Sequence, residues 1–209
     1  MEYNEKQIQI IEAAEQLFAD KGFDGTSVRN IAEEAGINIA MISYYFGSKE
    51  KLMEALFEHR TGHIRLKVES LLKDDSHTPL EKMNVLIDEY IDRVMKKQQF
   101  YKIMICEQVI NKNPVIIRLS NCLKIRNAEI ITMLIKDGQK KGAFNKNIDV
   151  IMMLNTMIGT VTQMMISKDY YREFNKLSSV SDEKFEALLK QKLGDHIKNL
   201  FKAIFIYEA

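Results

Sequence analysis

Apolar side chains recur three and four positions apart along most of the chain, the spacing that places them on one face of an α-helix. In the first such stretch Ile8, Ile11 and Ala14 share a face, and Gly22 can end the helix. The pattern predicts about nine helices, at about 4–21, 28–35, 39–45, 49–72, 79–94, 100–110, 114–138, 147–167 and 181–205. We therefore expect an all-α fold, with three short N-terminal helices followed by a larger helical body.

Polar segments separate these helices and carry signals for where the next one starts. In the segment KDDSHTP, Thr78 is a good N-cap, Pro79 suits the first helical position and Glu81 completes a capping box. Asn147 is the expected N-cap of the apolar helix that follows it. Residues 168–179 are expected to form a polar linker before the last helix.

The composition is typical of a helical protein, whereas the overall net charge does not indicate a binding partner. Of 209 residues only two are proline and nine glycine, so few residues break helices, and the formal net charge is +1. Residues 1–60 hold six basic and eleven acidic side chains, a net of −5. A domain that binds nucleic acid usually has the opposite bias. Any binding to nucleic acid by this segment must then depend on a few placed contacts.

Two cysteines, Cys106 and Cys122, are too few for a disulfide scaffold, and their apolar surroundings predict buried free thiols. The most apolar stretch, 150–166, contains Asn155 and Gln163 and falls short of a clean membrane span of about 20 residues. We interpret it as a buried helix. With a polar start to the chain, this predicts a soluble, cytoplasmic protein that does not interact with membranes.

No arrangement of residues predicts an enzyme, a cofactor or a metal site. The sequence contains no glycine-rich phosphate loop, nucleophile elbow or zinc spacing. His59 and His63 lie four residues apart and could share a helix face as metal ligands, but a site needs three or four convergent ligands. We favour solvated or packed histidines at both positions.

The stretch IAEEAGINIAMISYYFGSKEKL, residues 31–52, has the layout of a helix-turn-helix motif. Two short helices meet at Gly36, where a Cβ atom would be costly, and Ile31, Ala32 and Ile42 face the core. The second helix of such a motif enters the major groove of DNA. We therefore predict a helix-turn-helix domain at 1–48 and a ligand-binding and dimerisation domain at 49–209, bridged by a helix at 49–72.

The longer stretch GFDGTSVRNIAEEAGINIAMISYYFGSKEKLMEALFE, residues 22–58, resembles the DNA-binding domain of the TetR (tetracycline repressor-like) family. The similarity lies in the FDGT turn, the IA and AG pairs, the YF pair and SKE followed by Leu52. The resemblance implies a homodimeric repressor that binds double-stranded DNA at a palindromic operator. It also implies a pocket for an effector and a dimer interface formed by the last two long helices.

The resemblance and the physical chemistry of the side chains give the expected DNA contacts. Arg29 would reach bases or phosphates, and Asn38 could bond adenine with both amide atoms. Lys49, in the first turn of its helix, would add its charge to a phosphate site. Met41 and one of the two tyrosines could equally be packing residues. The complete set of expected contacts is Thr26, Ser27, Arg29, Asn38, Ile39, Ala40, Met41, Ser43, Tyr44, Tyr45 and Lys49.

The effector is expected to be a small hydrophobic molecule of unknown identity. Twelve methionines are unusually many, and they can be core and interface packing or a deformable pocket wall. Asn155, a polar residue in an apolar helix, would need a partner if buried, either a ligand or another protein group. The candidate pocket residues are Tyr101, Met104, Ile105, Gln108, Cys122, Ile125, Met152, Asn155 and Thr156.

These features together predict a ligand-responsive transcriptional regulator, most simply a repressor. The acidic first sixty residues keep an alternative open. In that alternative the protein is a helical small-molecule-binding or dimeric interaction protein with weak or no DNA binding.

Overall fold

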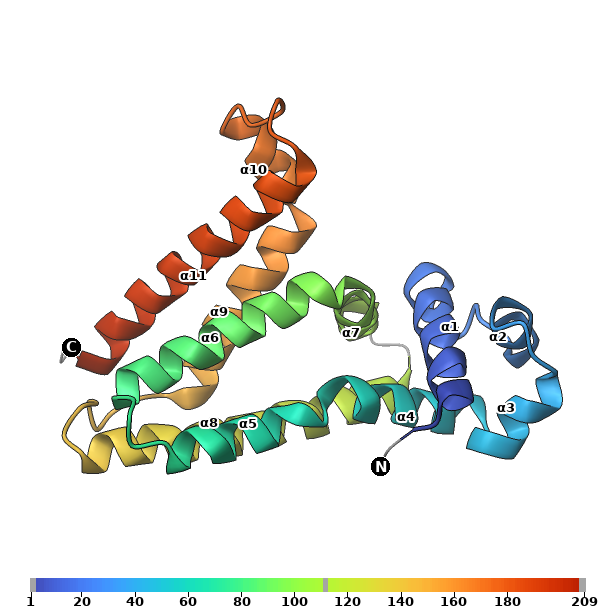
Figure 1. Ribbon diagram of the computed structural model, residues 1–209, viewed down its shortest axis with the longest axis horizontal. Helices are drawn as coiled ribbons and strands as arrows, with labels where there is room; N and C mark the ends of the chain where they lie inside the picture. The colour runs from blue at the N-terminus through green and yellow to red at the C-terminus, as the bar shows by residue number, and fades with distance from the viewer. Residues whose placement is uncertain (1–2, 111–112, 207–209) are drawn as a thin grey trace. The chain divides into compact units, whose positions relative to one another are not determined.

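The computed structural model describes residues 3–110 and 113–206 and, within them, consists of helices without strands (Figure 1). The all-α prediction is confirmed. The helices are α1 (Glu5–Lys21), α2 (Val28–Glu34), α3 (Ile39–Phe46), α4 (Lys49–Thr61), α5 (His63–Lys73), α6 (Pro79–Lys96), α7 (Gln98–Ile110), α8 (Pro114–Lys140), α9 (Val150–Ile166), α10 (Lys168–Phe174) and α11 (Asp182–Ile206).

The described residues contain more helices than the nine expected, for two local reasons. The bridging helix predicted at 49–72 is interrupted at Gly62, so that α4 ends at Thr61 and α5 begins at His63. Glycine costs about 1 kcal/mol in a helix interior, which makes it a natural point for a break. The segment predicted as a linker at 168–179 begins with the helix α10.

One predicted cap was wrong, and one predicted helix end was close. Asp149, not Asn147, caps α9, because its carboxylate accepts a hydrogen bond from the backbone N–H of Met152 at 3.0 Å. The predicted end of α8, marked by Gly138 and Gly142, agrees with the observed end at Lys140 between them. A Cβ atom at position 138 would lie 2.2 Å from the ring of Phe144, so this glycine allows the ring to pack against the helix.

The first three short helices each start at a side-chain cap. Asn4 and Ser27 form capping boxes at α1 and α2, and Asn38 caps α3. With seven and eight residues, α2 and α3 are far too short to be stable alone, so their stability must come from packing. The caps satisfy backbone N–H groups that a short helix would otherwise leave without partners.

The chain divides into two compact units, which we describe separately. The first comprises residues 1–64 and 97–126, and the second comprises 65–96 and 127–209. In the first unit α1 packs against α2, α4 and α7, and one core contains Phe18, Ile42 and Leu56 together with Phe100 of α7. This unit is larger than the predicted DNA-binding domain at 1–48, because packing adds α4, α7 and part of α8 to it. The boundary at residue 48 therefore remains a prediction about which residues bind DNA.

In the second unit α6 packs lengthwise against α11, and α9 contacts α6, α10 and α11. Lys190 of α11 bonds Asp92 of α6 at 2.5 Å, and Lys198 bonds Asp88 at 2.6 Å. α9 is only partly buried, since Met153, Met157 and Val161 lie inside while Ile151, Met152 and Ile166 are more than half exposed. The prediction that 150–166 is a buried helix therefore holds for one face alone.

Among the described residues no single helix is long and apolar enough to cross a membrane. By length and composition α9 and α10 would pass such a test as a pair, but they are bent by 72°.

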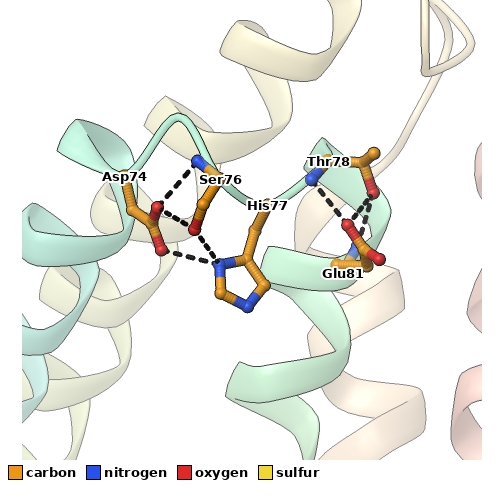
Figure 2. Close-up of polar contacts among 5 residues, drawn as sticks. All are labelled: Asp74, Ser76, His77, Thr78 and Glu81. Carbon is orange, nitrogen blue, oxygen red and sulfur yellow. Dashed lines mark hydrogen bonds and ion pairs between the residues drawn. The ribbon is translucent and has the colours of Figure 1, made fainter.

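The turn between α5 and α6 consists of two small hydrogen-bonded clusters (Figure 2). Asp74 accepts bonds from the backbone N–H and hydroxyl of Ser76 and pairs with His77, and these contacts lower its pKa to about 2. Glu81 accepts bonds from the backbone N–H and hydroxyl of Thr78, which lower the pKa of its carboxyl group. In return the backbone N–H of Glu81 donates to the Thr78 hydroxyl at 3.3 Å. The predicted capping box is therefore present.

Replacing Thr78 by alanine is expected to lower the free energy of unfolding by about 1 kcal/mol, because α6 then loses its side-chain cap. Urea denaturation followed by circular dichroism at pH 7 measures this. Thr78→Ser keeps the hydroxyl and is the matched control, with an expected loss below about 0.5 kcal/mol. Equal losses in both variants would show that the hydroxyl does not stabilise the start of α6.

Candidate nucleic-acid interface

The connection between α2 and α3 fixes which side chains face outward. Gly36 adopts a positive φ of 61°, a conformation that suits glycine, and Ile37 N–H bonds the Ala32 carbonyl at 3.0 Å. Ile31, Ala32 and Ile42 are at most 4% exposed. Burial of these three side chains holds the two helices together and leaves the opposite side of α3 in solvent.

The outer side of α3 presents a mixed apolar and aromatic surface. Tyr44 is 83% exposed and Ile39 is 48% exposed, and Tyr45 is half-buried with its ring 5.1 Å from that of Tyr44. The other predicted contacts on this helix are Ala40 and Ser43, which are exposed, and Met41, which is half-buried. We call the exposed side chains Asn38, Ile39, Ala40, Ser43 and Tyr44, with Ser27 and Arg29 of the adjoining α2 start, the reading face.

Arg29 and Ser27 belong to the start of α2. Arg29 Nε donates to Glu33 Oε1 at 3.0 Å, with side chains 81% and 63% exposed. Such an exposed pair contributes little, so Arg29 can exchange Glu33 for another anion at low cost. Ser27 Oγ accepts from the Asn30 backbone N–H at 3.1 Å and donates to Asn30 Oδ1 at 2.6 Å.

Asn38 already has a structural task at the start of α3. Its Oδ1 accepts a hydrogen bond from the Ala40 backbone N–H at 2.8 Å. A bidentate contact to adenine uses both the oxygen and the nitrogen of the amide. Contact between Asn38 and an adenine would therefore break the hydrogen bond that caps α3. The sequence alone does not reveal this cost.

Two further predicted contacts, Thr26 and Lys49, bond inside the protein. Thr26 is 1% exposed, and its hydroxyl lies 2.8 Å from the Gly22 carbonyl and 3.2 Å from the Leu17 carbonyl. Lys49 Nζ donates to the carbonyl of Phe23 at 2.8 Å and to that of Thr26 at 2.9 Å. In this conformation neither polar group points to a ligand.

Comparison with known proteins identifies the family to which this chain belongs. Residues 10–56 match the model described as "Bacterial regulatory proteins, tetR family", and residues 57–191 match "YsiA-like protein, C-terminal region", which is more than half of the chain. The chain belongs to the tetR family of bacterial regulatory proteins. The resemblance that the sequence suggested is therefore confirmed.

Curated relatives of this TetR-family chain have names of regulators, not of enzymes. It is 31% identical over 134 residues to the probable HTH-type transcriptional regulator YttP of Bacillus subtilis, covering 64% of each chain. It is 31% identical over 142 residues to the HTH-type transcriptional repressor NicS of Pseudomonas putida, covering 66% of each. The chain thus spans a little under two thirds of the length of these relatives. The prediction that it is not an enzyme agrees with the family.

Solved structures share the fold at low sequence identity. The fatty acid degradation regulator FadR from Bacillus halodurans gives a TM-score of 0.69 at 20% identity, covering 95% of this chain and 97% of that one. FadR from Bacillus subtilis, in complex with stearoyl-CoA, gives 0.67 at 20% identity, covering 94% and 98%. At this identity the likeness establishes the fold alone.

Some acidic residues of the first unit pair with cations away from the reading face. Arg60 of α4 donates to Glu15 of α1 through Nε at 2.8 Å and Nη2 at 2.5 Å, with side chains 10% and 7% exposed. Lys102 of α7 lies 3.4 Å from Asp20 of α1. The net charge of residues 1–60 is therefore a poor guide to the charge near DNA, because some of the acidic side chains join α1 to its neighbouring helices.

Replacing Glu15 by glutamine is expected to lower the free energy of unfolding by about 2 kcal/mol, because a buried, charge-assisted hydrogen bond becomes a neutral one. Glu12→Gln is the matched control. The Glu12 side chain is 59% exposed and 3.8 Å from Arg60, so its loss should stay within about 0.5 kcal/mol. Urea denaturation measures both, and an equal loss in the two variants would contradict a special role for the buried pair.

The candidate pocket residues are divided between the two units. Met104 is buried, and Tyr101 and Ile105 are half-buried, in the first unit. The remaining described candidates, Cys122 and Ile125 on α8 and Met152, Asn155 and Thr156 on α9, are exposed. The side chain of Gln108 lies outside the described residues. The pocket remains a prediction.

Helix geometry explains why Asn155 and Cys122 are exposed. Each residue advances about 100° around a helix, so a residue two positions from a buried one faces almost the opposite way. Asn155 lies two positions from both Met153 and Met157 and is exposed. The prediction of buried thiols was wrong, because Cys106 and Cys122 are both exposed. Cys122 lies two positions from the buried Ser120.

His59 shows no arrangement that would bind a metal. Its ring is half-buried and meets Tyr3 edge-on at 6.0 Å, and burial, followed by the nearby Arg60 charge, lowers its pKa. No group of three His, Cys, Asp or Glu side chains in the described part of the chain could hold a metal ion. The side chain of His63 lies outside that part.

Proposed function

We propose that the chain is a transcriptional repressor that binds a palindromic operator as a homodimer and is released by a small hydrophobic effector. The observation that carries the proposal is the reading face, in which a well-packed short helix exposes Tyr44 and Ile39 while Arg29 is exposed on the α2 helix packed against it. A recognition helix inserts such a surface into the major groove, with phosphate contacts fixing its position. Relatives named transcriptional regulators and repressors support this role.

The proposed division of work follows the geometry of each side chain. Arg29 and Ser27 would contact phosphates or base edges from α2. Ala40, Ile39 and Met41 would contact thymine methyl groups, and Ser43, Tyr44 and Tyr45 would donate hydroxyls. Asn38 would read a base only by giving up its cap, and Thr26 would contact DNA only by giving up bonds that it makes inside the protein.

The dimer and the effector site belong to the same proposal. α9 and α11 would form the dimer interface, consistent with the exposed Ile151, Met152 and Ile166 of α9. An effector that binds better to another spacing of the two reading faces would weaken DNA binding by its difference in affinity. The relative FadR in complex with stearoyl-CoA supports an apolar effector. We place this activity in the cytoplasm.

The test is a fluorescence anisotropy titration of ligand-free protein with DNA from upstream of its own gene and with scrambled DNA of equal length. We expect selective binding at moderate salt, with a log–log salt slope no steeper than about −8 per dimer, because few cations are available to phosphates. Equal affinity for both DNAs would contradict the repressor and favour the alternative, a helical ligand-binding or interaction protein. The acid excess of residues 1–60 is what keeps that alternative in view.

A further inference from the structure

Lys82, in the first turn of α6, is buried although it carries a charge. The residue is 0% exposed, and among the described residues of the second unit it is the one charged residue that is buried. Its Nζ atom has no hydrogen-bond partner in the part of the chain that the structure describes. A buried ammonium group without an opposite charge is strongly unfavourable. Lys82 therefore lacks the anion that its burial calls for.

The carboxylates of α6 do not supply this anion, because all four have other partners. Glu81, next to Lys82 in the chain, is exposed and accepts hydrogen bonds from Thr78. Each residue advances about 100° around a helix, so neighbouring side chains leave α6 in different directions. The other three carboxylates pair with lysines of α5 and α11, in the pairs Glu89–Lys67, Asp88–Lys198 and Asp92–Lys190.

Lys82 lies at an apolar end of the second unit. The two ion pairs between α6 and α11 show that these packed helices run antiparallel, so the first turn of α6 lies beside the last turns of α11 (Figure 1). There α11 buries Phe201 and Phe205, and the ring of Phe205 stacks on that of Phe144 at 4.4 Å between centroids. On α6, the residue after Lys82 is the buried Met83. An anion that binds Lys82 would therefore have apolar neighbours.

We propose that the Lys82 ammonium binds the carboxylate of an apolar carboxylic acid. A carboxylate brings one negative charge and acceptor oxygens to a group that has donors only. A neutral partner would accept the hydrogen bonds without balancing the charge, and a phosphate dianion would leave excess negative charge among apolar side chains. This inference rests on the proposed function, because it adds an acidic group to the hydrophobic effector proposed above.

The position of Lys82 near a helix end gives a ligand a route to the buried ammonium. The Cα–Cβ bond of a helical residue tilts toward the N-terminus of the helix, so the Lys82 side chain starts in the direction of the α5–α6 turn. Thr78 in that turn is exposed. Helix ends open locally at a lower free energy than helix centres. Opening of the first turn would uncover Lys82 while the rest of α6 stays packed against α11.

The first measurement compares octanoate with octan-1-ol, which has the same chain length and no charge, by titration calorimetry of the full chain at pH 7. We expect octanoate to bind at least about tenfold more tightly, because a hydrogen bond between charged groups is stronger than a neutral one. Acetate, which lacks the apolar chain, is expected to bind at least about 100-fold more weakly than octanoate. Equal affinities for octanoate and octan-1-ol would overturn the proposal.

The second measurement removes the charge. In Lys82→Met and in Lys82→Gln the affinity for octanoate should fall by about tenfold or more, to that for octan-1-ol. Lys96→Met is the matched control, because Lys96 is exposed on the same helix and pairs with Asp92. Its loss should leave the affinity for octanoate unchanged. Wild-type affinity for octanoate in both Lys82 variants would contradict the proposal.

The third measurement is the thermal unfolding of the ligand-free protein. Lys82→Met is expected to raise the midpoint by about 3 °C or more, because an apolar chain of similar volume replaces a buried charge without a partner. Lys96→Met should leave the midpoint within about 1 °C of the wild type. A lower midpoint in both Lys82→Met and Lys82→Gln would show that the protein itself balances the charge, and the proposal would then be wrong.

The two proposals fail in different ways. If octanoate and octan-1-ol bind alike, the carboxylate site at Lys82 is wrong, while selective binding to upstream DNA still supports the repressor. If the wild-type protein binds no upstream DNA, the repressor proposal fails. The preference for octanoate, and its loss in the two Lys82 variants, then supports the carboxylate site without reference to DNA.

Discussion

Replacing Phe100 by alanine is expected to lower the free energy of unfolding of the first unit by about 4 kcal/mol. Phe100 belongs to α7, far along the chain from the helix-turn-helix, yet it is 2% exposed and part of the same core as α1 and α4. Its ring meets that of Phe57 of α4 edge-on at 5.0 Å. Truncation removes this contact and leaves a cavity among side chains that α1, α4 and α7 share.

Chemical denaturation followed by circular dichroism at pH 7 measures this loss. The matched control is Phe174→Ala on α10, where the ring is 73% exposed and the expected loss stays within about 0.5 kcal/mol. If Phe100→Ala lowered the free energy of unfolding by less than about 1 kcal/mol, the assignment of α7 to the core of the first unit would be contradicted.

The role of α7 in this core is a feature that the sequence could not predict. Helical spacing identified 100–110 as a helix because periodicity is a local property. Which helix covers which face depends on contacts between residues far apart in the chain, such as Phe57 with Phe100 and Asp20 with Lys102. The sequence boundary at residue 48 followed the motif, whereas the packing follows these contacts.

Helices and caps were predictable where the signal was local. Thr78, Pro79 and Glu81 predicted the start of α6, and the capping bonds are present. The interruption at Gly62 was missed because one glycine within an otherwise helical pattern lowers helix stability without deciding where a helix ends. The helix α10 was missed because its polar sequence resembled a linker.

The candidate site shows the same limit. The resemblance and the side-chain chemistry predicted that Tyr44 and Arg29 contact DNA, and both side chains are exposed. The sequence could not show that the polar atoms of Thr26 and Lys49 form hydrogen bonds inside the first unit. Those bonds depend on how the loop after α1 folds back. A polar side chain in a binding motif can serve the ligand or the scaffold, and only coordinates separate the two.

Replacing Arg29 by alanine is expected to weaken operator binding by at least about 30-fold in a dimer, because a guanidinium contact contributes about 1–3 kcal/mol and is lost in both half-sites. Tyr44→Ala is expected to weaken binding by about tenfold, through loss of one hydroxyl bond for each subunit. Both side chains are highly exposed, so neither change should alter the free energy of unfolding by more than about 0.5 kcal/mol.

The claim that the reading face binds DNA is tested most directly by anisotropy titrations of Arg29→Ala and Tyr44→Ala against upstream and scrambled DNA. Tyr170→Ala is the matched control, since this tyrosine is 69% exposed on α10 in the second unit. We predict that both reading-face variants lose affinity for upstream DNA while the control binds like the wild type. Wild-type affinity in both reading-face variants would contradict the account.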